Sequence, residues 1–320
     1  MGISFKAAWS KPSTILLASD IPVDETAFAF ALAQSAQFDS ALVIFHAIEG
    51  KSEVSLGVSG KQDDARASYT QAKERYLETL AQRAIGFGVR CKVVVRIGLA
   101  SDQILSFLRE GRVDRVVMGN RSPGPIGKLL VGSVAEAVIR QANVPVCIVG
   151  SDVVASSYRN SATRNILCDV SIEDGRRVVA SFGAELAAEH HAKLILQDTI
   201  RPQEKDSILA GRTIDQIEAE LPSLVPAGLQ DDINVRTKVA LGDPTEELLY
   251  GCRSQNASFI VLGAQGASHF AAITCASMMY KVLAFANCPV ITLSPVVLAE
   301  CGAGDHLPRI TDVNYLAGVV

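Results

Sequence analysis

The stretch 118-MGNRSPGPIGKLLVGS-133 contains the residue types that could hold the phosphates of a ligand. Glycines let a backbone approach an anion closely, and a Gly-Ser pair that opens a helix directs free N–H groups and the helix dipole toward it. Gly132 and Ser133 form such a pair, and Lys128 adds a positive charge. Two prolines in the middle act against this function, because proline has no N–H to donate. A simple helix cap at Ser133 and a solvated surface lysine at Lys128 are the alternatives.

The composition argues against several other classes of protein. A net charge of −4 and 6% aromatic residues leave no basic stripe interleaved with aromatics, so we expect no nucleic-acid binding. No run reaches the roughly 18 apolar residues of a membrane span, and the start of the chain lacks a signal-peptide core. The seven cysteines are scattered without a Cys-x-x-Cys, which predicts reduced core thiols and a cytoplasmic location.

Catalytic and metal sites have little support in the residue pattern. His190 and His191 are adjacent at the end of an expected helix, where they cannot share one face, and no Cys or carboxylate cluster has metal-ligand spacing. His269 beside Ser268 lacks the Gly-x-Ser-x-Gly elbow of a hydrolase. Without a general base or a Walker-type Lys-Ser, we expect no enzyme, or at most a weak ATPase.

The chain repeats itself, and this feature decides its organisation. The segment 15-ILLASDIPVDETAFAFALAQSAQF-38 aligns without a gap on 166-ILCDVSIEDGRRVVASFGAELAAE-189. Farther along, at a different offset, 98-GLASDQILSFLREGRVDRVVMG-119 aligns on 242-GDPTEELLYGCRSQNASFIVLG-263. The segments 42-LVIFHAI-48 and 193-KLILQDT-199 also align, as do 143-NVPVCIV-149 and 287-NCPVITL-293. Two matches on each side of one length difference indicate a tandem, with domains expected at 10–150 and 160–295 and a C-terminal tail at 296–320.

Each half alternates short apolar strands with amphipathic helices, which predicts right-handed βαβ crossovers and a parallel sheet of the α/β class. Strands are expected at 14–19, 41–48, 91–96, 114–118 and 144–149, and at 165–170, 192–199, 233–240, 258–262 and 288–293. Helices are expected at about 24–38, 63–85, 101–111 and 132–142, and at 174–190, 206–221, 244–255 and 276–286. Ligands of such sheets bind at the carboxyl ends of the strands, near the topological switch point.

Each half resembles a universal stress protein domain, over nearly all of residues 10–295. The resemblance rests on ILLASD, FHAI, VVMG and, most specifically, GSVAEAVIRQANVPVCIV. It implies two tandem doubly wound, Rossmann-like domains that pair internally through their last strands, as the family's dimers do. It also implies a role in stress survival, with ATP or AMP bound in some members and Mg²⁺ accompanying ATP. A further homodimer and protein partners stay undefined.

Nucleotide-binding members of this family carry Gly-x-x-Gly, nine residues, then Gly-Ser or Gly-Thr. The first half matches except that Ser122 replaces the second glycine, and Pro123 and Pro125 remove two donors from the loop. The resemblance places Asp20 at the ribose hydroxyls and Ala47 beside the adenine, although Asp20 could instead cap the first helix. The first-half candidates for nucleotide binding are Asp20, Ala47, Met118, Gly119, Ser122, Lys128, Gly132, Ser133 and Val134.

The second half breaks the same motif at another place. Gly263 and Gly266 are present, but Ala276 precedes Ser277 where the third glycine is required. The alignment also places Ser171 opposite Asp20 and Asp198 opposite Ala47, although Asp169 is near enough to serve if the strand shifts. A carboxylate beside adenine or phosphate is unfavourable, so Gly263, Gly266 and Ser277 are the weaker candidates.

Two functions therefore remain open from the sequence. The first is a stress-response protein that binds an adenine nucleotide in its first half. The second is a nucleotide-free interaction scaffold whose motifs have both degenerated.

Overall fold

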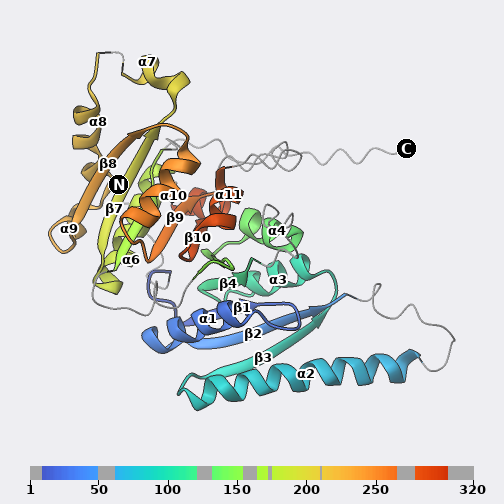
Figure 1. The fold of residues 1–320 in the computed structure, drawn as a ribbon. Helices are drawn as coiled ribbons and strands as arrows, with labels where there is room; N and C mark the ends of the chain where they lie inside the picture. Colours follow the sequence, from blue (N-terminus) through green and yellow to red (C-terminus); the bar gives the residue numbers. More distant parts are fainter. Residues whose placement is uncertain are drawn as a thin grey trace, which may run out of the picture.

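The structure is a computed structural model that describes residues 9–49, 62–120, 132–153, 164–171, 175–209, 211–264 and 278–301. Its centre is a ten-stranded sheet in the order β3-β2-β1-β4-β5-β10-β9-β6-β7-β8 (Figure 1). Each half contributes five adjacent strands with the same order relative to the chain. The two halves are therefore repeats of one doubly wound unit, as the sequence predicts.

The first half follows the expected alternation closely. Its strands are β1 (Thr14–Ala18), β2 (Ala41–Ile48), β3 (Cys91–Ile97), β4 (Arg115–Gly119) and β5 (Val146–Val149). Its helices are α1 (Glu25–Phe38), α2 (Gln62–Gly86), α3 (Ala100–Arg109) and α4 (Ser133–Gln141). All pairings within this half are parallel, and β1 lies between β2 and β4.

The second half repeats these elements with a different middle segment. Its strands are β6 (Asn165–Asp169), β7 (Lys193–Ile200), β8 (Val235–Leu241), β9 (Phe259–Gly263) and β10 (Val290–Leu293). Its helices are α6 (Arg176–His190), α7 (Lys205–Ile208), α8 (Ile214–Glu220), α9 (Ala227–Gln230), α10 (Pro244–Ser254), α11 (Met278–Phe285) and α12 (Pro295–Cys301), with 3-10 turns at Pro202–Glu204 and Leu221–Leu224.

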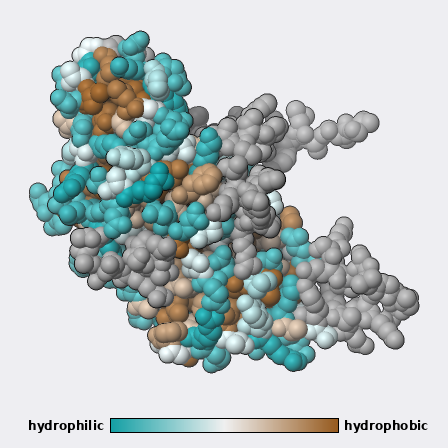
Figure 2. Space-filling model, viewed as in Figure 1, coloured by the Kyte–Doolittle hydropathy of each residue, from teal (hydrophilic) through white to brown (hydrophobic). Residues whose placement is uncertain are grey.

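Helices cover both faces of the sheet. One core contains side chains of α1, α2, α6 and α12, and the other contains side chains of α3, α4, α10 and α11. The central strands are apolar at nearly every position because both of their faces are buried, as is usual for parallel sheets. Figure 2 shows a mainly hydrophilic outer face, with an apolar area over the end of the second half that carries α7 and α8.

The prediction of one helix over 206–221 is wrong. Thr213 begins a new helix there, because its side chain accepts a hydrogen bond from Gln216 N while the Gln216 side chain accepts one from Thr213 N. This capping box fixes the start of α8, and Gly211 at φ +75° lets the chain turn just before it. The single expected helix is therefore split into α7 and α8.

The segment predicted to be a tail begins with a buried helix. Ser294 accepts a hydrogen bond from Val297 N at 3.1 Å, which caps the start of α12. Val297 and Leu298 are fully buried, so α12 completes the core beside β10. Beyond Cys301, the expected tail lies outside the described residues.

The two halves join through their last strands, as the resemblance implies. β5 and β10 pair antiparallel, with Cys147 opposite Ile291. Thr292 Oγ1 donates to Val146 O at 3.2 Å, and Ser294 Oγ donates to Ala142 O at 2.5 Å. No helix in the described part of the chain is long and apolar enough to cross a membrane.

Candidate functional site

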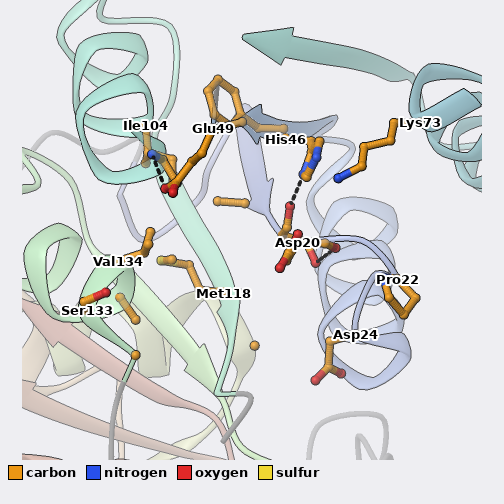
Figure 3. A pocket seen from close by; sticks show the side chains of 18 residues that line it. Asp20, Pro22, Asp24, His46, Glu49, Lys73, Ile104, Met118, Ser133 and Val134 are labelled. Carbon is orange, nitrogen blue, oxygen red and sulfur yellow. Dashed lines mark hydrogen bonds between the residues drawn. The ribbon is translucent and has the colours of Figure 1, made fainter. Parts of the chain in front are cut away.

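A cavity of about 520 Å³ opens at the carboxyl ends of β1, β2 and β4 in the first half (Figure 3). β1 lies between β2 and β4, so this is the topological switch point, where doubly wound sheets bind ligands. The lining residues are Ala18, Ser19, Asp20, Pro22, Asp24, Phe45, His46, Ala47, Glu49, Lys73, Ala100, Ile104, Met118, Gly119, Gly132, Ser133, Val134 and Ala135.

The structure brings together every described first-half candidate. Seven candidates line this one cavity: Asp20, Ala47, Met118, Gly119, Gly132, Ser133 and Val134. Ser122 and Lys128 lie outside the described residues. Of the second-half candidates, Gly263 ends β9, while Gly266 and Ser277 also lie outside the described residues.

Asp24, and not Asp20, caps the first helix. The Oδ1 atom of Asp24 accepts hydrogen bonds from Thr26 N at 2.9 Å and from Ala27 N at 3.1 Å. Asp20 is exposed, and its Oδ1 atom accepts a bond only from the neighbouring Ile21 N, at 2.7 Å, among the contacts of the described residues. The capping alternative for Asp20 is therefore wrong, and its carboxylate faces the cavity with hydrogen-bonding capacity left over (Figure 3).

One wall of the cavity is apolar. Phe45, Ile104 and Met118 are buried, and Ala47 and Val134 are half-buried beside them. The ring of Phe107 on α3 supports Phe45 from behind, with ring centroids 5.4 Å apart. This wall can accommodate a flat hydrophobic group, because it offers apolar surface without charged side chains.

The start of α4 lies beside this wall, at Ser133 and Val134. Gly132 is the N-cap, and Ser133 is the first helical residue, so the alternative of Ser133 as the cap is wrong. Gly132 has no side chain to bond the first N–H groups, and no side-chain cap is found for this helix in the described chain. Free N–H groups at a helix start favour an anion such as a phosphate.

The sequence analysis missed five polar residues of the lining, namely Ser19, Asp24, His46, Glu49 and Lys73. His46 is buried, and its Nδ1 atom must donate to Ser19 O at 3.1 Å, because a carbonyl oxygen only accepts. Glu49 accepts a hydrogen bond from Ala100 N at 3.2 Å and thereby caps the start of α3. His46 and Glu49 could have been found from their places at the end of a strand beside Ala47.

Lys73 could not have been found in this way, because it reaches the cavity from α2. It points toward His46 and the cavity in Figure 3. The next turn of α2 is tied to the loop after β1, because Tyr76 Oη accepts a hydrogen bond from Val23 N at 3.2 Å. Only the packing of α2 against the sheet brings a lysine to this position.

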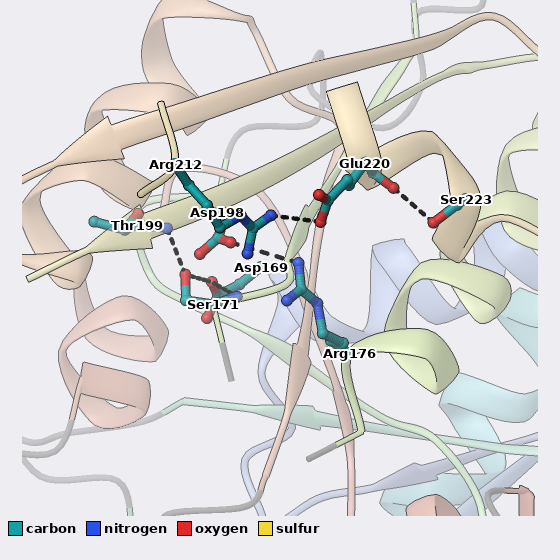
Figure 4. A network of polar contacts seen from close by, with 8 residues as sticks. All are labelled: Asp169, Ser171, Arg176, Asp198, Thr199, Arg212, Glu220 and Ser223. Carbon is teal, nitrogen blue, oxygen red and sulfur yellow. Dashed lines mark hydrogen bonds and ion pairs between the residues drawn. The ribbon is translucent and has the colours of Figure 1, made fainter. Parts of the chain in front are cut away.

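In the second half, polar side chains form a network at the carboxyl ends of β6 and β7 (Figure 4). Asp169 is buried and accepts bonds from Ser171 N at 3.1 Å and Ser171 Oγ at 2.5 Å. Ser171 Oγ in turn accepts a bond from Thr199 N at 2.8 Å. Asp198, also buried, lies 3.5 Å from Arg176. Asp169 is thus buried and bonded to Ser171, whereas Asp20 of the first half is exposed.

Burial raises the pKa of Asp169, and the neighbouring Asp198 raises it further, while the bonds from Ser171 lower it. Two carboxylates are thus held close together at the carboxyl ends of β6 and β7. An anion bound there would meet both carboxylates, of which Asp198 is paired with Arg176.

Comparisons with known proteins agree with this duplicated architecture. The model of the universal stress protein family matches residues 13–150 and again residues 163–294. A universal stress protein of Methanocaldococcus jannaschii is 24% identical over 131 residues, which are 41% of this chain and 76% of that protein. Universal stress protein G of Shigella flexneri is 34% identical over 116 residues, 36% of this chain and 80% of that protein.

A solved universal stress protein from Archaeoglobus fulgidus has the same fold. It superposes with a TM-score of 0.68 at 19% identity, over 89% of this chain and 97% of its own. The two family matches cover most of the sequence and coincide with the two halves of the sheet. This chain belongs to the universal stress protein family and contains two such domains in tandem.

Proposed function

We propose that this protein binds one adenine nucleotide, ATP or AMP, in the first-half cavity and acts in the stress response through that bound state. The observation that carries the proposal is the position of an apolar wall, a carboxylate and an uncapped helix start around one cavity of about 520 Å³. These three features suit the three parts of a nucleotide. A cavity of this size falls within the range of small-molecule sites.

Each part of the nucleotide has a suitable partner. Ala47, Met118 and Val134 would contact the base with apolar surface. Asp20 would accept hydrogen bonds from the ribose hydroxyls, because its carboxylate has acceptor capacity left after the bond from Ile21 N. The N–H groups at the start of α4 would bind phosphate oxygens.

Charge decides how the phosphates are accommodated. The described wall contains the carboxylates of Asp20, Asp24 and Glu49 and the single lysine Lys73. A triphosphate would therefore bring Mg²⁺ with it, which supplies positive charge next to the phosphate oxygens. Lys128, outside the described residues, is the further cation that the sequence offers.

The polar network of the second half favours the scaffold function for this half of the chain. Its polar network occupies the equivalent strand ends, and two buried carboxylates disfavour an anionic ligand. We therefore propose one nucleotide per chain, with the second half as a structural partner. A cytoplasmic location and a role in stress survival are proposed from the family alone.

Thermal unfolding with and without millimolar ATP and Mg²⁺ tests the proposal. A ligand at about 100 times its dissociation constant stabilises the folded state by roughly 2.7 kcal/mol, which moves the midpoint clearly upward. Asp20→Ala should remove this shift, whereas Asp232→Ala, an exposed aspartate of the second half, should retain it. Titration calorimetry should give one nucleotide per chain. A shift that survives Asp20→Ala would move the site elsewhere, and no shift would favour the scaffold for both halves.

A further inference from the structure

Two cysteines far apart in the sequence meet in the second half. Cys252 lies near the end of α10, and Cys288 lies in the turn that leads into β10. Their Sγ atoms are 3.4 Å apart, and Cys252 Sγ is 3.1 Å from Asn287 Oδ1. Thiols at this separation need only a small movement to reach the roughly 2.05 Å of a disulfide bond.

The first half provides an internal comparison for this pair. In the alignment of the two halves, Leu108 stands opposite Cys252 and Val144 opposite Cys288. Leu108 and Val144 are buried apolar residues of the equivalent core. The fold therefore accepts ordinary apolar side chains at both places, and packing does not require sulfur at either. Both members of the contact are cysteines in the second half alone.

The pair lies just beneath the surface. Both side chains are buried, but Arg253, Ser254 and Asn256 at the end of α10 are exposed, and Asn287 is half-buried. Helix ends open locally at low cost in free energy, so a water-sized oxidant can reach the sulfur atoms. The hydrogen bond between the thiols lowers the pKa of Cys252 and raises that of Cys288, which makes Cys252 the sulfur that reacts first.

We propose that Cys252 and Cys288 form a reversible disulfide when the protein meets a hydroperoxide, so that the second half contains an oxidation-sensitive site separate from the first-half cavity. With hydrogen peroxide, the Cys252 thiol releases its proton, the thiolate attacks one peroxide oxygen, and the O–O bond breaks to give a sulfenic acid and hydroxide. The hydroxide takes up the proton that Cys252 released and becomes water. The Cys288 sulfur then attacks the Cys252 sulfur, the S–O bond breaks, and the proton of Cys288 leaves with that oxygen as water. Two thiols are oxidised and one peroxide is reduced to two water molecules.

The disulfide bond would link the end of α10 covalently to the turn before β10. β10 is the strand that pairs with β5, so the crosslink lies next to the junction of the two halves. It closes a loop between positions that are 36 residues apart and thereby restricts the unfolded chain. Oxidation should therefore stabilise the second half against unfolding, and a thiol reductant should reverse the effect.

Peptide mapping of the intact chain tests this site. The folded protein is treated with hydrogen peroxide, quenched, unfolded and alkylated, and the peptides are identified by mass spectrometry. We expect loss of alkylation at Cys252 and Cys288 together, one crosslinked peptide lighter by two hydrogen atoms, and full recovery with dithiothreitol. Cys147 and Cys168, also buried, should stay alkylated and act as internal controls.

The variant Cys252→Leu/Cys288→Val reproduces the side chains of the first half and should fold. It should show no crosslink and no peroxide-dependent rise in the urea midpoint, whereas the unmodified chain shows both. Sulfinic or sulfonic acid at Cys252 with Cys288 still alkylated would overturn the proposal. A crosslink from Cys288 to Cys147, or retention of both thiols at peroxide levels that oxidise a free thiol, would overturn it equally.

Discussion

Gly119 and Asp24 are in direct contact at the edge of the first-half cavity. A Cβ atom on Gly119 would lie 3.0 Å from both the Cβ and the Oδ2 atom of Asp24. Asp24 is the side chain that caps α1. The end of β4 can therefore lie this close to the start of α1 only because Gly119 has no side chain. The glycine that the motif assigns to phosphate binding thus also has a structural role.

Gly119→Ala should weaken the α1 cap and the nucleotide site together. The new methyl group displaces Asp24, and loss of a helix cap costs about 0.5–2 kcal/mol of the free energy of unfolding. Urea unfolding measures this cost, and calorimetry measures the affinity for ATP. Gly86→Ala, at the end of α2 with nothing within 4 Å of the new atom, is the matched control and should not lower the free energy of unfolding or the affinity for ATP. Unchanged unfolding of Gly119→Ala would show that Asp24 can shift without loss of the cap.

His190 should make the protein less stable as the pH falls below neutral. Burial, together with Arg115 and Arg164, lowers the pKa of His190 from 6.5 to about 3. Its Nδ1 atom receives bonds from Gln37 at 3.1 Å and Arg164 at 2.9 Å, so the neutral ring is an acceptor across the junction. Between pH 6.5 and 3 the unfolded chain binds a proton that the folded chain does not. Stability contributed by this histidine is therefore present above pH 6.5 and decreases by up to about 1.4 kcal/mol per pH unit below it.

Urea unfolding at pH 7 and pH 5 checks this prediction. His190→Gln should show a smaller loss of stability between the two pH values than the unmodified chain. His191→Asn, at the exposed neighbour whose φ of +51° suits asparagine, should retain the full loss. Equal losses in all three proteins would contradict a neutral His190.

Asp169→Asn should stabilise the protein at neutral pH. The raised pKa of Asp169 means that the folded state holds the carboxyl proton more tightly than the unfolded state. The contribution to stability is therefore largest below the pKa of an unfolded aspartate and is lost as the pH rises through the raised value. Asparagine can still accept the bond from Ser171 Oγ without a charge, and should raise the free energy of unfolding at pH 7. The gain should shrink at pH 4, and the exposed Asp232→Asn should show none.

Phe30→Ala should destabilise both halves at once. Phe30 of α1 packs edge-on against Phe259 of β9, with ring centroids 6.0 Å apart and an angle of 64° between the rings. Both rings are fully buried, and removal of such a side chain costs about 3–5 kcal/mol. Calorimetry should show one transition that moves down as a whole. Two separate transitions, with only one displaced, would show that the halves unfold independently.

The Phe30 and Phe259 variants combined should cost less than the sum of the two single losses. Aromatic pairs contribute about 0.5–1.5 kcal/mol beyond the burial of each ring, and this coupling is counted twice when the single losses are added. A strictly additive double variant would mean that the two rings are buried next to each other without a specific interaction.

The sequence predicted most of the secondary structure because strands and helices here follow local hydrophobic periodicity. The strand expected at 41–48 is β2, and the helix expected at 244–255 is α10. Where the prediction is wrong, a local side-chain bond overrides the period: the capping box at Thr213 splits the helix expected over 206–221. α12 was missed because seven residues are too few for a periodic signal, and its stability comes from burial of Val297 and Leu298.

The sequence by itself determined the duplication, the α/β class, the pairing of the last strands through the family resemblance, and seven of the residues around the first-half cavity. These features are contained in local patterns and in the comparison of one half with the other. Only the tertiary structure decided that Asp24 and not Asp20 caps α1, that Lys73 reaches the cavity from α2, and that Cys252 meets Cys288. These contacts join residues of different elements, and their distances depend on how helices pack on the sheet, which no local pattern encodes.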